Sequence, residues 1–508
     1  MSRLRKTFFL SVVLLLLVAG SAPVAGAAKP AKMSCESLVN LGLKDTVISS
    51  ATVVPVGALL PGDAAAPVST CRVVGAISGN INFEVWLPAT GWNGKFNGVG
   101  NGGLAGFINY GSMSAALARG YATASTDTGH QAFLGDGSWA FNRPDLLVDF
   151  GYRAIHVTTV AAKEIVRAYY GQAPKYSYFT GCSGGGQQGL AEVQRYPADY
   201  DGVVSGAPAN FPTHMWPGEL YPAWLTQNGT ASAIPVGKLP YITQAVLAAC
   251  DGLDGVTDGV IDDPRKCTFD PTPLLCSGAD APTCLTAPQL DVVIKIYAGL
   301  KDPAGQQFWP PYEVSGEIGW GGHIGEPFSI PPSYFKFMVL EDPSWDWKTF
   351  SFTDPNNFAI MNDAHYRLGP ILNATESDLN AFKRLGGKLI MYHGWIDQNI
   401  APRNSINYYQ SVVETMGGKH QAQSFIRLFM APGMQHCGGG PGPDTFDSLG
   451  ALEEWVEHNK APEKMIASHL TSGVVDRTRP LCVYPQVAQY KGKGDTNDAK
   501  NFICVNPK

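Results

Sequence analysis

The stretch FTGCSGGGQQGL, residues 179–190, decides how this chain is interpreted, because it places Ser183 in a G-x-S-x-G pattern. The preceding residues, KYSYFT, are aromatic and β-rich and predict a strand. The following residues, GQQGLAEVQRYP, repeat apolar side chains at helical spacing and predict a helix that ends at the proline. A serine on a glycine-rich turn between a strand and a helix is typical of a nucleophile elbow. The alternative is an ordinary glycine-rich turn whose serine has no chemical role.

A serine nucleophile needs a general base, and the base needs an acid that orients it. After a nucleophile elbow these follow in the order Asp, His. Asp397 ends a buried-strand pattern (GGKLIMYHGWID), at the edge where parallel sheets place their sites. His436 follows an apolar strand pattern (SFIRLFMAP) and precedes a glycine-rich loop. We therefore predict a catalytic triad of Ser183, Asp397 and His436, and a structural role for His393 inside the first strand pattern.

The cysteines suggest an oxidised protein, because their count of ten is even. Cys182 directly precedes Ser183, and Cys437 directly follows His436. If the imidazole lies within hydrogen-bond reach of the hydroxyl, the neighbouring Cα atoms fall in the disulfide range of about 4.4–6.8 Å. We predict a Cys182–Cys437 bond, the alternative being two free buried thiols. Close spacing suggests four further disulfides, Cys35–Cys71, Cys250–Cys267, Cys276–Cys284 and Cys482–Cys504.

Length and composition indicate a globular protein larger than one ordinary domain, with 508 residues, 45% apolar and 16% charged. A net charge of −6 argues against a nucleic-acid partner. The basic start MSRLRK, the apolar run Phe8–Ala19 and the small residues near position 27 predict a signal peptide over residues 1–27. A retained anchor is the alternative. We expect a secreted or periplasmic protein without membrane attachment after cleavage.

The set Cys182-Ser183, Asp397 and His436-Cys437 resembles the mark of the tannase and feruloyl esterase family of α/β-hydrolases, in which the two cysteines are bonded. The resemblance implies an α/β-hydrolase fold and ester hydrolysis through an acyl-enzyme. Members act on gallate and hydroxycinnamate esters, and one bacterial branch cleaves mono(2-hydroxyethyl) terephthalate. Four further stretches are similar to the family: NGVGNGGLAG (97–106), GWGG (319–322), EDPSWDWKTF (341–350) and MYHGWIDQNI (391–400).

An oxyanion hole is expected from two backbone amides. One donor is the N–H of Gly184, the residue after the nucleophile. The second belongs to the loop GNGG, which follows the strand-like GKFNGV, and is either Gly102 or Gly103. Glycines there allow amides to approach a developing negative charge. An ordinary glycine turn is the alternative.

The loop CDGLDGVTDGVIDDPRKC crowds Asp251, Asp254 and Asp258 between two cysteines. Carboxylates held this close repel one another unless a cation lies between them, and Ca²⁺ takes six to eight oxygen ligands. The resemblance implies a structural Ca²⁺ here, bound by these three side chains and by the backbone carbonyls of Val256 and Val260. The alternative is a solvated acidic turn; a zinc site is disfavoured because the loop has no histidine.

Asp397 lies 214 positions after Ser183, more than a bare hydrolase sheet needs. We predict a catalytic domain made of residues 28–207 and 371–508, and an inserted lid domain over 208–370 that carries the calcium loop. Most aromatic side chains of the lid are expected in its core, and a few in an aromatic acyl pocket. The candidates are Phe308, Trp309, Trp320, Tyr334, Phe335, Phe337, Trp345 and Trp347.

These features together predict a secreted serine carboxylesterase that hydrolyses feruloyl, hydroxycinnamoyl or galloyl esters. The nearest alternative is an esterase like mono(2-hydroxyethyl) terephthalate hydrolase. That enzyme has a phenylalanine three residues after the acid, where this chain has Ile400, which favours plant-polyphenol esters. Two alternatives of other kinds are a peptidase of the same fold and a non-catalytic, calcium-binding module.

Overall fold

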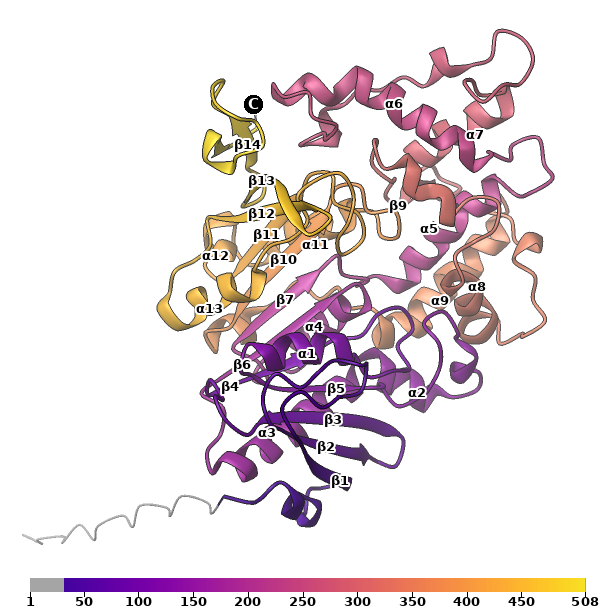
Figure 1. Cartoon of the computed structure of the whole chain (residues 1–508). Helices are drawn as coiled ribbons and strands as arrows, with labels where there is room; N and C mark the ends of the chain where they lie inside the picture. Colours follow the sequence, from indigo (N-terminus) through magenta and orange to yellow (C-terminus); the bar gives the residue numbers. More distant parts are fainter. Residues whose placement is uncertain (1–31, 508) are drawn as a thin grey trace, which may run out of the picture.

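The computed structural model describes residues 32–507 (Figure 1), so the predicted signal peptide lies outside the described residues. A nine-stranded sheet forms the centre of the molecule, in the order β1-β2-β3-β5-β4-β6-β7-β10-β11. The run from β5 to β11 is parallel, whereas β1, β2 and β3 pair antiparallel at one edge and β3 pairs antiparallel with β5. The strands are β1 (Thr46–Val54), β2 (Thr70–Ile77), β3 (Ile81–Pro88), β4 (Lys95–Val99), β5 (Ala122–Thr126), β6 (Tyr176–Cys182), β7 (Gly202–Gly206), β10 (Lys388–Gly394) and β11 (Ile426–Ala431).

Helices cover both faces of this sheet, which explains why strands β5, β7 and β11 are buried along their whole length rather than on alternate residues. One apolar core lies under α3 (Ala154–Tyr170), α4 (Gly184–Arg195), α10 (Asn380–Arg384), α11 (Arg403–Thr415) and α12 (Lys419–Gln423). A second core on the opposite face includes side chains from α1 (Tyr110–Ala118) and α13 (Ser448–His458). The result is a three-layer α/β arrangement.

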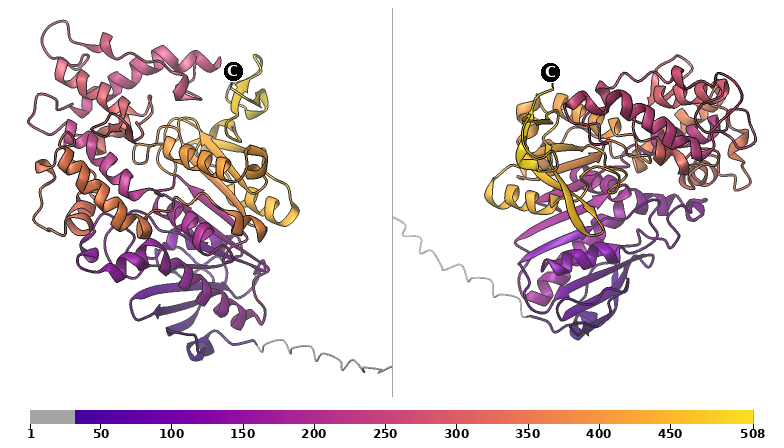
Figure 2. Two further views of the ribbon diagram at one scale, coloured as in Figure 1. Left: turned by 180° about the vertical axis from the view of Figure 1, so that it is seen from behind. Right: turned by 45° about the horizontal axis from the view of Figure 1, so that its top comes forward.

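The segment between β7 and β10 is mainly helical and gathers to one side of the molecule (Figure 2). One apolar core lies on α6 and α7. Another is centred on α5, α8 and α9 and also includes residues outside the segment, such as Leu104 and Phe150. This placement agrees with an insertion between the nucleophile and the acid, and its predicted boundaries at 208 and 370 stay predictions. The elements are α5 (Pro212–Leu225), α6 (Leu239–Cys250), α7 (Ala287–Ala298), β8 (Leu300–Lys301), β9 (Gln307–Trp309), α8 (Ile330–Tyr334) and α9 (Pro355–Leu372).

The remaining elements are α2 (Pro144–Val148), which follows β5, and two small hairpins near the C-terminus. The hairpins are β12 (Lys464–Thr471) with β13 (Val474–Cys482), and β14 (Val487–Tyr490) with β15 (Phe502–Val505). No helix within residues 32–507 is long and apolar enough to cross a membrane.

Candidate active site

Ser183 lies on a tight turn between β6 and α4, as the sequence predicts. Its φ of 64° is in the left-handed region, which costs free energy for a residue with a side chain. Close packing of the turn requires glycine: a Cβ at Gly181 would lie 2.4 Å from the carbonyl oxygen of Gly185. The turn is held by neighbouring backbone, because the Ser183 N–H donates to the carbonyl of Gly206 (2.9 Å) and its carbonyl accepts from the N–H of Ala209 (3.1 Å).

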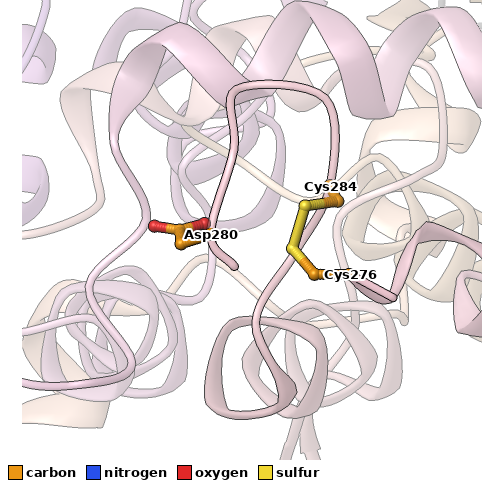
Figure 3. Close-up of side chains that lie close together, drawn as sticks. All are labelled: Cys276, Asp280 and Cys284. Atoms are coloured by element: carbon orange, nitrogen blue, oxygen red, sulfur yellow. A yellow bond between two sulfur atoms is a disulfide. The ribbon is translucent and has the colours of Figure 1, made fainter. Parts of the chain in front are cut away.

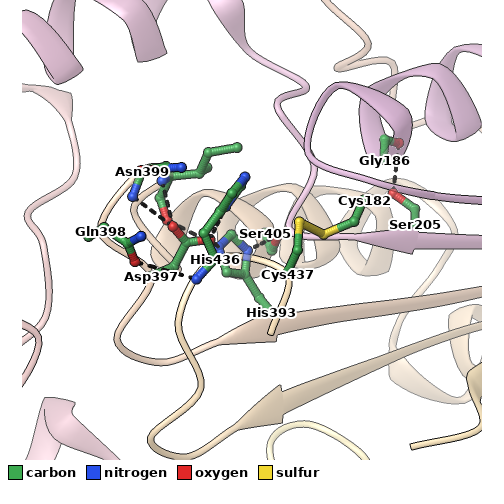
Figure 4. The surroundings of a disulfide bond; sticks show 11 residues. Cys182, Gly186, Ser205, His393, Asp397, Gln398, Asn399, Ser405, His436 and Cys437 are labelled. Atoms are coloured by element: carbon green, nitrogen blue, oxygen red, sulfur yellow. Dashed lines mark hydrogen bonds and ion pairs between the residues drawn. A yellow bond between two sulfur atoms is a disulfide. The ribbon is translucent and has the colours of Figure 1, made fainter. Parts of the chain in front are cut away.

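The Cys182–Cys437 disulfide is present and joins the end of β6 to the loop after β11 (Figure 4). Its Cα atoms are 6.0 Å apart, within the range expected from the sequence. The bond therefore ties the turn that carries Ser183 to the loop that carries His436. The four other predicted disulfides are also present in the structure.

Asp397 and His436 are in direct contact at the carboxyl ends of β10 and β11. The Nδ1 of His436 lies 2.7 Å from Oδ2 of Asp397, and Oδ1 accepts from the N–H groups of Asn399 (2.8 Å) and Ile400 (2.9 Å). Burial alone would raise the pKa of the Asp397 carboxyl, but the charge of His436 and the hydrogen bonds from two histidines outweigh it and lower that pKa. Asp397 is therefore ionised and oriented toward the ring.

The same contact raises the pKa of the His436 imidazole, whereas it lowers that of the Asp397 carboxyl. Burial lowers the pKa of His436, but the charge of Asp397 and the hydrogen bond to it outweigh burial and raise that pKa above its ordinary value. Because Nδ1 faces the carboxylate, Nε2 is the nitrogen left to accept a proton.

Ser183 and His436 both line one cavity, but the described residues show no hydrogen bond between the serine hydroxyl and the imidazole. The structure thus brings the three predicted triad residues together and forms the acid–base contact, while the serine–base contact is not made. In hydrolases without substrate this second contact is often long and shortens when substrate binds.

His393 has a role that the sequence indicated only as structural. It is fully buried in β10, and its Nε2 lies 3.1 Å both from Oδ2 of Asp397 and from the carbonyl of Ile400. Since both partners are acceptors, Nε2 is the donor, and Nδ1 lies 2.7 Å from the Ser405 hydroxyl. His393 therefore donates a second hydrogen bond to Oδ2, the same carboxylate oxygen that His436 contacts (Figure 4).

The three glycines predicted for the oxyanion hole lie side by side. A Cβ on Gly184 would be 3.0 Å from the carbonyl oxygen of Gly103 and 3.5 Å from its nitrogen. Gly184 is the first residue of α4, where no intrahelical carbonyl is available to its N–H. In the described chain the N–H groups of Gly102 and Gly103 likewise donate no hydrogen bond. All three residues line the cavity, so their amides are available to a ligand.

Asn101 and Gln188 hold this glycine loop against α4, and the sequence analysis missed both. The amide of Gln188 accepts from the N–H of Asn101 (2.9 Å) and donates to its side-chain oxygen (3.1 Å). The Asn101 side chain also donates to the carbonyls of Phe107 and Thr126. Asn101 lies in the GNGG loop, and Gln188 lies in the glycine-rich stretch after Ser183. No spacing rule links an asparagine in the first motif to a glutamine in the second.

The cavity has a volume of about 410 Å³ and is mainly apolar, although its aromatic lining differs from the prediction. None of the eight lid aromatics proposed for it is among the described lining residues. Seven of them belong to the apolar cores of the lid, where Trp320 and Phe335 are almost fully buried, because a large ring is most stabilised where it loses all its exposed surface. Phe337 is half-buried and belongs to neither core. The aromatic side chains that do line the cavity are Phe107, Phe150, Trp216 and Phe328.

The predicted calcium loop carries aspartate carboxylates whose oxygens could bind a cation. Burial and the charges of Asp258 and Asp251 raise the pKa of Asp254 to about 6, although a hydrogen bond and Arg479 oppose them. Arg479 forms an ion pair with Asp258, and Asp251 accepts from the N–H of Gly259 (2.9 Å).

The backbone carbonyls of this loop fit a cation as well. Val256 and Val260 are buried, and in residues 32–507 neither carbonyl accepts a hydrogen bond. Buried carbonyls are normally paired, so these two oxygens, in a loop that also carries three aspartates, suit a hard cation such as Ca²⁺.

Two other groups of side chains converge closely enough to be considered as metal sites. In the group of Figure 3, Cys276 and Cys284 are bonded to each other, so neither sulfur is a free thiolate, and Asp280 pairs with Lys238. The other group joins His156 of α3, Glu192 of α4 and Asp199, which follows α4. Neither group contains the aspartates of the predicted calcium loop.

Comparison with known proteins gives consistent results. The family model for tannase and feruloyl esterase matches residues 66–505. An uncharacterized esterase of Xanthomonas campestris pv. campestris is 40% identical, and a mono(2-hydroxyethyl) terephthalate hydrolase of Piscinibacter sakaiensis is 34% identical; each alignment covers 94% of this chain and 92% of the relative.

The crystal structure of feruloyl esterase B from Aspergillus oryzae superimposes with a TM-score of 0.86 at 30% identity, covering 93% of this chain and 99% of that chain. This likeness confirms the predicted α/β-hydrolase fold. The chain therefore belongs to the tannase and feruloyl esterase family of carboxylic ester hydrolases.

Proposed function

We propose that the protein is a serine carboxylesterase that hydrolyses esters of aromatic acids, of the feruloyl, hydroxycinnamoyl or galloyl type. The observation that carries this proposal is the convergence of Ser183, on a strained turn, with the His436–Asp397 pair in one aromatic-lined cavity. The ester chemistry agrees with the family, and the aromatic lining gives a planar acyl group surfaces to pack against.

In the proposed mechanism Ser183 attacks the ester carbonyl while Nε2 of His436 takes its proton. Asp397 holds the imidazole and stabilises its positive charge. The N–H of Gly184 and that of Gly102 or Gly103 stabilise the oxyanion, each by roughly 3–4 kcal/mol. His436 then protonates the leaving alcohol, and a water molecule activated by the same ring releases the acid from the acyl-enzyme.

The charge of the cavity supports phenolic acid esters over the nearest alternative, a terephthalate monoester. No lysine or arginine is among the described residues that line it, and Glu219 is. A terephthalate monoester carries a carboxylate, which is costly to bury without a cationic partner. Ferulate and gallate esters carry only neutral phenols at that end. Ile400, three residues after Asp397, also lines the cavity. The lining therefore supports phenolic acids over terephthalate.

We further propose that a structural Ca²⁺ occupies the loop closed by the Cys250–Cys267 disulfide. Its ligands would be the side chains of Asp251, Asp254 and Asp258 and the carbonyls of Val256 and Val260. Bound there, the ion would neutralise the repulsion among the carboxylates and stabilise the lid.

Five disulfides fit an extracellular or periplasmic protein. We propose that the chain is exported by a signal peptide in residues 1–27 and acts on small ester substrates. The start of the mature chain, read by N-terminal sequencing of the exported protein, would test this.

The test of the proposed function is a hydrolysis panel of methyl ferulate, methyl gallate and mono(2-hydroxyethyl) terephthalate, with wild-type protein and Ser183→Ala. We expect turnover of the phenolic esters and none by the variant. A matched p-nitrophenyl ester and amide distinguish an esterase from a peptidase. Labelling of Ser183 by a fluorophosphonate distinguishes an enzyme from a non-catalytic calcium-binding module. Near wild-type activity of Ser183→Ala would refute the assignment.

A further inference from the structure

Helix α5 presents one face to the active-site cavity. Four of its residues line the cavity at the spacing i, i+3, i+4 and i+7, which places them in one stripe along the helix: Pro212, Met215, Trp216 and Glu219. The first three are apolar. Glu219 is therefore the single ionisable side chain that the helix places at the cavity, and the proposed mechanism does not use it.

Glu219 is buried without a partner. Only 3% of its surface is exposed, and within residues 32–507 its Oε2 has no hydrogen-bond partner. Burial, and then the charge of Asp397, raise the pKa of Glu219 well above its ordinary value. Burial thus favours the neutral form of the Glu219 carboxyl, which offers an O–H donor and an acceptor oxygen.

A second buried polar group without a partner lies near this carboxyl. Tyr312 is 6% exposed, and its hydroxyl has no hydrogen-bond partner in the described part of the chain. Burial, and then the charges of Glu219 and Asp397, raise the pKa of Tyr312. Each unpaired buried polar group costs about 1–3 kcal/mol. Tyr312 is not among the described residues that line the cavity, so Glu219 is the one of the two that a ligand in the cavity can reach.

The position of Glu219 along α5 indicates which part of a substrate it would contact. The N–H of Ala209 bonds to the carbonyl of Ser183, so the start of α5 lies beside the nucleophile. From Pro212 to Glu219 is seven residues, or about 10 Å along the helix axis. An acid held along this stripe with its ester carbonyl at Ser183 would bring its far end toward Glu219.

Resting on the proposed function, we propose that Glu219 determines acyl specificity by hydrogen-bonding the ring hydroxyl of a hydroxycinnamic ester. A phenol can both accept from the carboxylic O–H and donate to its carbonyl oxygen, so the pair satisfies both groups. A site built to bond a substrate hydroxyl discriminates strongly against the analogue that lacks it, because its own polar atoms are then left unpaired.

The test compares methyl p-coumarate with methyl cinnamate, which differ only in that hydroxyl. The measured quantity is the ratio of their kcat/KM values in the wild type, Glu219→Leu and Glu219→Gln. We expect the ratio to fall at least about tenfold in the leucine variant, which is similar in size but cannot hydrogen-bond. The glutamine variant keeps a donor and an acceptor and should retain most of the ratio.

Two results would overturn the proposal. An unchanged ratio in Glu219→Leu would show that the carboxyl does not contact the hydroxyl, whether or not overall activity falls. Equal loss of the ratio in the glutamine and leucine variants would also count against the proposal, because glutamine keeps a hydrogen-bond donor and an acceptor at the same place. Failure of the proposed function is a different outcome, because wild-type protein would then hydrolyse neither ester.

Discussion

Replacing Cys182 and Cys437 by serine tests whether their disulfide holds the catalytic geometry. The bond closes a segment of 255 residues and joins the residue before Ser183 to the residue after His436. The Asp397–His436 hydrogen bond does not depend on it directly. Without the bond we expect the loop after β11 to move relative to β6, and the imidazole to be held less firmly near the serine.

The size of the effect can be worked out for stability and for activity. By loop entropy the disulfide stabilises the fold by about 5.5 kcal/mol, because the unfolded chain loses the freedom of a 255-residue loop. The Cys276–Cys284 bond closes only 8 residues and is worth about 2.5 kcal/mol. A shift of about 1 Å between catalytic groups costs roughly 100-fold in rate. A 100-fold loss of rate corresponds to about 2.7 kcal/mol, less than the expected loss of stability, so activity has to be compared under conditions where the chain remains folded.

The assay measures kcat/KM on methyl ferulate and the free energy of unfolding in urea, for the wild type and two double variants. In C182S/C437S we expect activity to fall at least about tenfold under conditions where the chain remains folded. The control, C276S/C284S, lies outside the site and should lose stability but not activity. Full activity of C182S/C437S would refute the reasoning, and so would equal loss of activity in both variants.

Three further predictions follow from the site. Because Asp397 raises the pKa of His436, and the ring must be neutral to accept a proton, kcat/KM should fall as pH drops through a value above 6.5; a limb well below 6.5 would contradict this. His393→Leu should lower kcat about tenfold with little change in KM, because Asp397 loses one of its two imidazole donors; an equal rise in KM would contradict a positioning role. Removal of Ca²⁺ by a chelator should lower the melting temperature of the wild type but not that of Asp254→Asn, and equal melting curves with and without Ca²⁺ would exclude the site.

Local patterns predicted the elements that carry the chemistry. The strand before Ser183 and the helix after it are β6 and α4, and the apolar runs before Asp397 and His436 are β10 and β11. These predictions succeed because glycines that end an element and apolar runs that form one act over only a few residues. The disulfide at the site could also be predicted, because the two cysteines that close spacing left unpaired are neighbours of predicted catalytic residues.

Contacts between distant polar residues could not be predicted in the same way. The Asn101–Gln188 pair spans 87 positions. His393 is only four positions before Asp397, but the strand pattern does not show that the chain turns back after β10 and brings the two side chains into contact. The aromatic stretch of the lid was misleading for a related reason. Composition shows that large rings are present, but which of them, such as Phe328 rather than Trp320, face the cavity depends on helix packing.

The cavity is assembled from two parts of the chain that perform different tasks. The groups proposed to break the ester stand at the ends of sheet strands, whereas α5 and Phe328, in the segment between β7 and β10, line the space for the acid. Mutations in that segment can alter substrate preference without changing the residues proposed to cleave the ester. Grafting the intervening stretch from one relative onto the sheet of another would therefore exchange substrate preference and leave the bond-breaking step in place, a route open to evolution and to engineers alike.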